Sequence, residues 1–352
     1  MIKTEKINTS RGEVDVITIE NSCGASVKLC SLGASVMEII VPDRNGRLAD
    51  VAMGYADVES YWDDLPNSGK TAGRYANRIV HGKLTVAGVD YQLAVNCGDH
   101  HLHGGVVGFQ HKNWTSAVEG DLVVFTHVSP DGDENYPGEL SVKVTYRFTD
   151  ENALEINYYA TTSAATVVSL TNHTYFNLAG HDSGSALDHR LLLHASRYLE
   201  ADSTAAPTGR LLNVEATPMD FRADSIIHAK PLRPSAESDF QTVVNAKGLD
   251  HCWVIDGWQK GKLSEVASLV DDCSGRVMDV FSTQPGVQVY TANWLTGSTP
   301  GGKNGADYND YDMVAIECQG LPDAPNHSHF PSQELLPGQT YHETIIYKFS
   351  TK

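Results

Sequence analysis

The strongest constraint on the fold is an alternation of apolar and polar residues along residues 140–148. Leucine, valine, tyrosine and phenylalanine occupy its even-numbered positions, and polar residues occupy the odd-numbered ones. Successive side chains of a β-strand point to opposite faces, so the apolar side chains of this stretch share one face of a sheet. The pattern resumes at Leu154, Ile156 and Tyr158, after the turn-forming segment Thr149-Asp150-Glu151-Asn152. The two stretches are therefore predicted to be adjacent antiparallel strands.

Similar short strand patterns recur along the chain, whereas helical patterns are scarce. The further runs lie at residues 14–19, 122–128, 191–193, 287–290 and 344–349. Turn signals such as Asp43-Arg44-Asn45-Gly46, Asp131-Gly132 and Pro337-Gly338 separate them, and only residues 57–64 suggest one or two helical turns. We predict an all-β fold, a large antiparallel β-sandwich with few short helices. No linker or repeat is visible, so we expect a single domain over residues 1–352.

Charge and composition narrow the classes of partner. The chain has 26 Lys+Arg against 44 Asp+Glu, a net charge of −18, which disfavours nucleic acid and anionic membranes. No apolar run approaches a membrane span, and since no apolar run follows Met1 we expect no signal peptide. The six cysteines form no C-x-x-C pair, so we interpret them as mostly reduced, buried thiols of a cytoplasmic protein. Dinucleotide and P-loop motifs are missing from the sequence.

A first candidate site is the segment His100-His101-Leu102-His103-Gly104-Gly105. In an extended strand His101 and His103 would point to the same side, a spacing that also suits metal ligands. The two glycines permit close approach of backbone or ligand. From the spacing alone a metal site, a sugar contact and an exposed turn all stay open.

A second candidate runs from Ser169 to Leu178 and includes Asn172, His173, Tyr175 and Asn177. An imidazole among amides, hydroxyls and aromatic rings suits a pocket for a neutral polyhydroxylated ligand. The alternative is a buried polar network that serves only the fold.

A third candidate is Glu317, which follows an apolar pair and is expected to be partly buried in a strand. Burial raises a carboxyl pKa, as a general base working near neutral pH requires, although a structural carboxylate paired with an arginine is the alternative.

Asp250 also lies beside apolar residues, and a glycosidase-type pair with Glu317 is conceivable. Arg74 and Arg78 could hold ligand oxygens or neutralise a carboxylate. No nucleophile motif of the G-x-S-x-G type occurs.

With these segments taken together, the chain resembles the aldose 1-epimerase (galactose mutarotase) family over nearly its whole length. Six motifs in the family's order carry the resemblance, and together they are highly specific: Gly73-Arg74-Tyr75-Ala76-Asn77-Arg78-Ile79, Leu102-His103-Gly104-Gly105, Thr171-Asn172-His173-Thr174-Tyr175-Phe176-Asn177-Leu178, Gly248-Leu249-Asp250-His251, Gln284-Pro285-Gly286-Val287-Gln288, and Glu317-Cys318-Gln319 with Pro322-Asp323-Ala324-Pro325-Asn326. The family's usual pattern is not followed at Ser68-Gly69-Lys70-Thr71-Ala72, and Cys318 stands at a position where the family varies.

The resemblance implies a fold, an activity and a set of residue roles. The fold is a galactose mutarotase-like supersandwich with an open carbohydrate cleft, and the activity interconverts the α and β anomers of free hexoses such as galactose and glucose. His173 matches the proton donor to the ring oxygen, Glu317 the base for the C1 hydroxyl, and His103 a second catalytic histidine. The matching substrate-binding positions are Asn77, Arg78, His103, His173, Tyr175, Asp250 and Gln288.

The resemblance also implies that no metal and no cofactor is needed and that the partner is a small free aldose, and we expect a monomer or homodimer. Three rival functions remain at this point. A hexose 6-phosphate 1-epimerase would need a basic pocket, of which the charge of −18 gives no sign. A non-catalytic sugar sensor would lack the acid or the base, and a metal-dependent isomerase would use His101 with His103.

Overall fold

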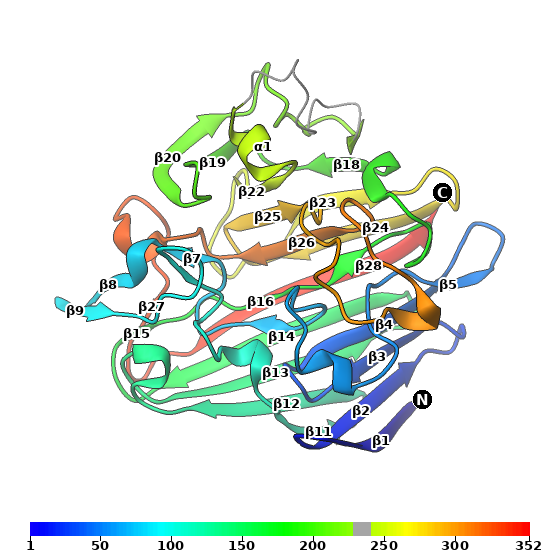
Figure 1. Cartoon of the computed structure of the whole chain (residues 1–352), viewed down its shortest axis with the longest axis horizontal. Helices are drawn as coiled ribbons and strands as arrows, with labels where there is room; N and C mark the ends of the chain where they lie inside the picture. Colours follow the sequence, from blue (N-terminus) through cyan, green and yellow to red (C-terminus); the bar gives the residue numbers. More distant parts are fainter. Residues whose placement is uncertain (228–240) are drawn as a thin grey trace.

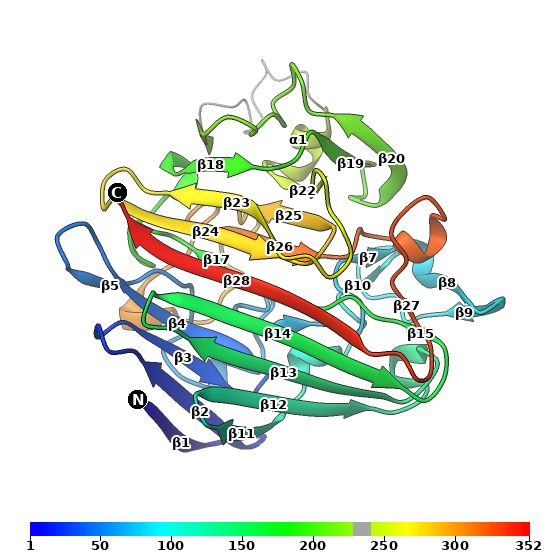
Figure 2. The same cartoon turned by 180° about the vertical axis from the view of Figure 1, so that it is seen from behind.

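The computed structural model describes residues 1–227 and 241–352, and antiparallel strands dominate its regular structure (Figures 1 and 2). The largest sheet has nine strands and forms the rear layer of Figure 1 and the front layer of Figure 2. In spatial order its strands are β11 (Thr115–Glu119), β12 (Leu122–Ser129), β13 (Leu140–Phe148), β14 (Ala153–Thr162), β28 (Tyr341–Thr351), β24 (Arg276–Ser282), β23 (Ser264–Val270), β18 (Arg190–Leu193) and β21 (Ser225–Ile226).

Two further sheets face or flank this layer. The six-stranded sheet runs in the order β17 (Tyr175–Phe176), β26 (Val314–Gln319), β25 (Gly286–Tyr290), β22 (Asp250–Val254), β19 (Arg197–Ala201) and β20 (Pro207–Asn213). The five-stranded sheet runs from β1 (Ile2–Thr9) through β2 (Gly12–Glu20), β3 (Ser26–Cys30) and β4 (Ser35–Pro42) to β5 (Leu48–Asp50). Small two-stranded pairs join β7 (Arg78–Ile79) to β10 (His101–Leu102), β6 (Thr71–Ala72) to β16 (Thr171–Asn172), β8 (Lys83–Val86) to β9 (Val89–Gln92), and β15 (Thr166–Val167) to β27 (Glu334–Leu335).

These sheets confirm the predicted antiparallel β-sandwich. The alternating stretch 140–148 is β13, and it pairs with β14 in antiparallel register from Phe148–Leu154 to Leu140–Thr162. Each of the other predicted runs also falls in a strand, namely β2, β12, β18, β25 and β28. The predicted turns around residue 60 are a short 3₁₀ helix, η1 (Glu59–Tyr61).

Helices are few and short in the described part of the chain. The α-helix there is α1 (Gln241–Ala246), and none of the described helices is long and apolar enough to cross a membrane. The remaining 3₁₀ turns are η2 (Val80–Gly82), η3 (Phe109–His111), η4 (Asp133–Asn135), η5 (Ala186–Asp188), η7 (Lys303–Gly305) and η8 (Ala324–Asn326).

The nine-stranded and six-stranded sheets pack through large aromatic side chains. Tyr347 on β28 is fully buried, donates a hydrogen bond to the Ile316 carbonyl at 3.0 Å, and packs against Phe176 on β17 with ring centroids 5.0 Å apart. Since side chains alternate along β26, Ile316 and Cys318 enter this core while Glu317 points to the opposite face. The packing therefore fixes which face of the six-stranded sheet carries the polar residues.

All six cysteines are free thiols. Cys30, Cys252 and Cys318 are buried as expected, but Cys23 and Cys273 are exposed and Cys97 is intermediate. The expectation of mostly buried thiols is thus met by half of them, because the others lie in turns and loops between strands.

Candidate active site

An open cleft of about 460 Å³ lies over the face of the six-stranded sheet that points away from the core. Its volume is in the range typical of small-molecule sites. The cleft is lined by Leu65, Pro66, Asn67, Asn77, Arg78, Leu102, His103, His173, Tyr175, residues 201–205, Thr242, Asn245, Ala246, Asp250, His251, Tyr290, Trp294, Leu295, Ser298 and Glu317.

Glu317 lies at the floor of this cleft. β26 is hydrogen-bonded to β25 on one side and β17 on the other, so Glu317 is only 2% exposed. Burial raises the pKa of its carboxyl group to about 8, the negative charge of Asp250 acts in the same direction, and Arg78 opposes them. One carboxyl oxygen has no hydrogen-bond partner among the described residues. Glu317 is therefore a proton-exchanging group poised near neutral pH.

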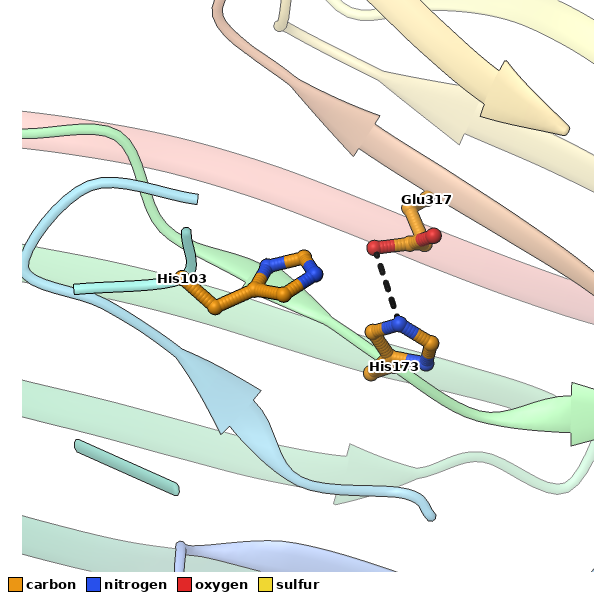
Figure 3. A group of neighbouring side chains, drawn as sticks. All are labelled: His103, His173 and Glu317. Atoms are coloured by element: carbon orange, nitrogen blue, oxygen red, sulfur yellow. Dashed lines mark ion pairs between the residues drawn. The ribbon is translucent and has the colours of Figure 1, made fainter. Parts of the chain in front are cut away.

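His173 follows β16 and faces Glu317 directly (Figure 3). Its Nε2 lies 3.6 Å from Glu317 Oε2, and the side chain is nearly fully buried. Burial lowers the pKa of its imidazole to about 4. Between these two pKa values the pair holds one proton in total, because the carboxyl pKa is raised and the imidazole pKa is lowered. A pair of this kind can take a proton at one atom and give one at another.

His103 lies beside His173 and Glu317, and its position depends on the glycine that follows it. Gly104 has φ +85°, and a Cβ there would lie 1.8 Å from the Gly73 carbonyl oxygen, so only glycine lets this turn lie against residues 73–77. The His103 Nδ1 accepts a hydrogen bond from the Asn77 backbone N–H at 3.2 Å. The pKa of His103 is well below its ordinary value mainly because desolvation of the partly buried ring disfavours its charged form, and His173 and Arg78 add to the effect. The neutral ring therefore carries its proton on Nε2, on the side of His173 and Glu317 (Figure 3).

This tautomer bears on metal binding. The ligand atoms of His103, His173 and Glu317 lie within 4.8 Å of one another, which suits a cation in distance. However, the His103 lone pair already accepts from Asn77, and its other nitrogen presents a hydrogen. The chemistry of this donor set fits a proton donor to a ligand oxygen better than a metal ligand.

The His101–His103 metal pair considered from the sequence is wrong. His101 is fully buried, and its two ring nitrogens bond to the Ala94 carbonyl and the Tyr136 hydroxyl, each at 2.6 Å. The strand β10 ends at Leu102, and His103 has φ +49°, so the two side chains do not share a face. His101 is a structural residue.

Most predicted substrate-binding residues meet in the cleft. Asn77, Arg78, Tyr175 and Asp250 line it together with the two histidines and Glu317. Gln288 lies behind them: it is the cross-strand partner of Glu317 and donates to Asp250 Oδ1 at 2.6 Å. It can therefore orient Asp250 rather than line the main cleft.

Other polar residues of the motifs serve the fold. Arg74 is 1% exposed and donates to the carbonyls of Pro137 and Gly138, each at 2.9 Å, so it does not reach the cleft. Asn172 and Asn177 donate to backbone carbonyls at 2.7 Å. In the segment 169–178 the amides thus belong to a buried network, whereas His173 and Tyr175 line the cleft.

Sequence reasoning missed the aromatic wall of the cleft. Tyr290 lies in the same strand as Gln288, two residues further on, and its ring centroid is 6.1 Å from that of Tyr175. The spacing of two was a signal that both face the same side. Trp294, 57% exposed at the rim, follows the strand in a loop, where no periodic pattern could indicate it.

A histidine and a carboxyl group that share one proton, at the floor of a polar cleft on an antiparallel sandwich, define an acid–base enzyme for a small polyhydroxylated molecule. The comparisons with known proteins make the class specific. The sequence model of the aldose 1-epimerase family matches residues 15–348. The chain belongs to the aldose 1-epimerase family and is an isomerase.

Individual relatives agree over nearly full length. Galactose mutarotase of Homo sapiens is 42% identical over 92% of this chain and 91% of its own length. Aldose 1-epimerase of Escherichia coli K12 is 35% identical over 95% and 94%. An aldose epimerase homologue from C. elegans superposes with a TM-score of 0.87 at 30% identity, covering 99% of each chain. Galactose 1-epimerase from Lactobacillus acidophilus gives 0.84 at 27% identity, covering 100% and 99%.

Proposed function

We propose that this aldose 1-epimerase acts on free hexoses such as galactose and glucose, with His173 as proton donor, Glu317 as proton acceptor and His103 as a second donor to the sugar. The observation that carries the proposal is the 3.6 Å separation of His173 Nε2 and Glu317 Oε2 at the floor of the cleft. Mutarotation needs two proton-exchanging groups on either side of the acetal carbon, and this pair supplies them.

Ring opening moves two protons in concert. Glu317 takes the proton of the C1 hydroxyl while His173 gives a proton to the ring oxygen, and the bond between C1 and that oxygen breaks to leave an aldehyde. Rotation about the C1–C2 bond turns the other face of the aldehyde to the C5 hydroxyl. Closure reverses the transfers, so the C5 hydroxyl proton goes to His173 and Glu317 reprotonates the oxygen on C1.

The proton content of the pair is the same before and after ring opening. The imidazolium–carboxylate form starts the opening, and the imidazole–carboxylic acid form starts the closure. With a raised carboxyl pKa and a lowered imidazole pKa the single proton rests mainly on Glu317, so the imidazolium–carboxylate form that starts the opening is the minor form of the pair. The Nε2–H of neutral His103 can donate to an oxygen beside C1 throughout.

The charges that line the cleft support a neutral sugar rather than a sugar phosphate. Arg78 is the one lysine or arginine among the described lining residues, and Asp202, Asp250 and Glu317 lie around it. A phosphate group would meet more acidic than basic side chains there. We assign to the hydroxyl groups and the apolar face of the sugar the side chains of Asn77, Arg78, Tyr175 and Asp250, with Gln288 acting through Asp250.

We also infer a cytoplasmic protein of one domain that acts in hexose metabolism as a monomer or homodimer. Six free thiols support a reducing compartment. A contiguous core with members from Ile17 to Phe349 supports a single domain among the described residues. The net charge of −18 supports the expectation that nucleic acid and membranes are not partners.

Polarimetry tests the function directly. Crystalline α-D-glucose or α-D-galactose is dissolved, and optical rotation is followed to equilibrium with and without protein, in the presence and absence of EDTA. We expect faster approach to the same final rotation, unaffected by EDTA. Folded protein that accelerates neither sugar would exclude the proposed substrates.

A further inference from the structure

A buried ion pair lies behind His173, and its lysine belongs to the segment 68–72, where the sequence does not follow the family's usual pattern. The side chains of Asp64 and Lys70 are both completely buried, and Lys70 Nζ lies 3.3 Å from Asp64 Oδ2. Asp64 also accepts from the Tyr55 hydroxyl and from the Ser68 backbone N–H. Lys70 Nζ donates to the Tyr61 carbonyl as well.

Such a pair is not explained by stability alone. Removing two charges from water costs about as much as their attraction returns, and apolar residues of similar volume often serve stability equally well. What a fully hydrogen-bonded pair does provide is one fixed arrangement of the segments that carry it. Here those segments are residues 55–61 and 64–70.

The fixed segment holds the backbone of His173. The Gly69 N–H donates to the His173 carbonyl at 2.9 Å, and the His173 N–H donates to the Lys70 carbonyl at 2.8 Å. The side chain of Asn172 adds a hydrogen bond to the Gly69 carbonyl at 2.7 Å. The placement of His173 against Glu317 is therefore set by the same residues that the ion pair fixes.

We propose that Asp64 and Lys70 are positioning residues for the proton donor: their ion pair holds residues 69–70 in the arrangement that aims His173 at Glu317. Neither residue lines the cleft, so both act through His173. The inference rests on the proposed role of His173, and it predicts loss of turnover rather than loss of sugar binding.

The charges of the pair also act on His173, in opposite directions. Asp64 and Asp250 raise the imidazole pKa against the lowering effect of burial. Lys70, paired with Asp64, must offset part of that effect by Coulomb's law. The other ionisable groups around His173 are Glu317 on β26, His103 after β10, Arg78 on β7 and Tyr175 on β17, and the variants below leave all four unchanged.

The test compares Asp64→Asn, Lys70→Met and the double variant with the wild-type chain. We expect Lys70→Met to lower kcat by at least about tenfold with little change in KM, because a small misplacement of a catalytic group is costly in rate. In the pH profile of the rate, the acid limb is the fall in rate at low pH as His173 takes up a proton. This limb should move to lower pH in Asp64→Asn and to higher pH in Lys70→Met. The double variant, which has no net change in charge, should return the limb toward its wild-type position.

Lys303→Met is the matched control. Lys303 pairs with Asp50, is 12% exposed, and also donates to two backbone carbonyls, but it holds no backbone group of His173. We expect this control to lower the urea midpoint without moving kcat or the acid limb. Should Lys70→Met not fold, Asp64→Asn still tests the downward shift of the acid limb, and the double variant still tests its return toward the wild-type position.

Histidine-labelled NMR separates this inference from the proposed function. The imidazole titration of His173, assigned through His173→Asn, should shift in opposite directions in the two single variants even if no sugar is turned over. Unchanged kcat and unchanged His173 titration in folded Asp64→Asn and Lys70→Met would overturn the inference. Absence of mutarotation in the wild type would instead overturn the proposed function.

Discussion

At the scale of single residues, the proposed acid and the proposed base can each be replaced by a side chain of similar shape. Glu317→Gln and His173→Asn each delete a proton-exchanging group from the cleft floor. General acid–base groups contribute on the order of 10²–10⁴-fold, so we expect each change to lower kcat by about that factor. Polarimetry with circular dichroism as the control for folding measures both. A folded variant with near-normal turnover would remove that residue from the mechanism.

Glu317→Gln should also change the pH dependence of stability. The folded-state pKa of Glu317 is about 8 against an ordinary 4.5, so its contribution to stability is present at low pH and is lost as pH rises through about 8. Between pH 5 and 9 the urea midpoint of the Gln variant should therefore fall less than that of the wild type. Parallel curves would mean that Glu317 is ionised in the folded protein.

The pH profile of kcat/KM reports the one-proton requirement. Below about pH 4 both His173 and Glu317 are protonated, so Glu317 cannot accept a proton. Above about pH 8 the pair has lost its shared proton, so it cannot donate one. We expect a bell with limbs near these values, measured with a non-ionising sugar. A rate that keeps rising above pH 9 would contradict it.

Asp250 links sugar binding to the base. Asp250→Ala should raise KM, because it removes a group that we assign to the sugar hydroxyls, and it should move the alkaline limb to lower pH, because it removes a negative charge that raises the Glu317 pKa. Initial rates over a range of sugar concentrations and pH measure the two effects. A fall in kcat with unchanged KM would show that Asp250 acts in the chemical step instead.

At the scale of structural elements, the arginine motif is divided between fold and site. Arg74 ties residues 73–75 to the end of β12 and to β15 through the Ser129 and Thr166 hydroxyls, at 2.7 and 3.1 Å, whereas Arg78, four residues on, lines the cleft. We expect Arg74→Lys to lower the free energy of unfolding by about 3 kcal/mol, since several buried acceptors lose their donor. Urea unfolding with KM measurement is the test. A raised KM at unchanged stability would place Arg74 in the site.

Strands were predictable where the alternation is regular and their neighbours are close in sequence. Residues 140–148 show both features, and β13 and β14 form as predicted. Glu317 was also predictable, because two apolar residues before a lone carboxylate indicate a buried strand. The pair Asp64–Lys70 was not, because charged residues usually lie at the surface and their burial depends on partners such as Tyr55 and Tyr61. The roles of His103 and Gln288 came from family resemblance rather than from residue patterns.

At the scale of the whole molecule, the β-layers carry the candidate site on one face of the six-stranded sheet. The cleft floor comes from β26 and the segments before β17 and after β10, which are far apart in sequence, so their convergence could be inferred only from the family. The rim residues from 65–67, 202–205 and 294–298 lie in loops without periodicity and could not be placed beforehand.

The acidic surface should not affect a neutral substrate. Steering by net charge requires a charged ligand, so kcat/KM for a free hexose should change by less than about twofold while the Debye length falls from about 30 Å to about 3 Å. Measurements from roughly 0.01 M to 1 M salt test this. A steep salt dependence would indicate an anionic or cationic substrate.

The single proton shared by His173 and Glu317 has a consequence for how the enzyme meets its substrate. In the proposed mechanism opening and closing exchange the two forms of the pair and restore the first, so a bound sugar can change anomer repeatedly during one residence without any proton entering from water. The protonation state of the pair after a full cycle of opening and closing is the same whichever anomer was bound first. The final mixture in solution is set by the relative stability of the two free anomers, and the protein changes only the time taken to reach it.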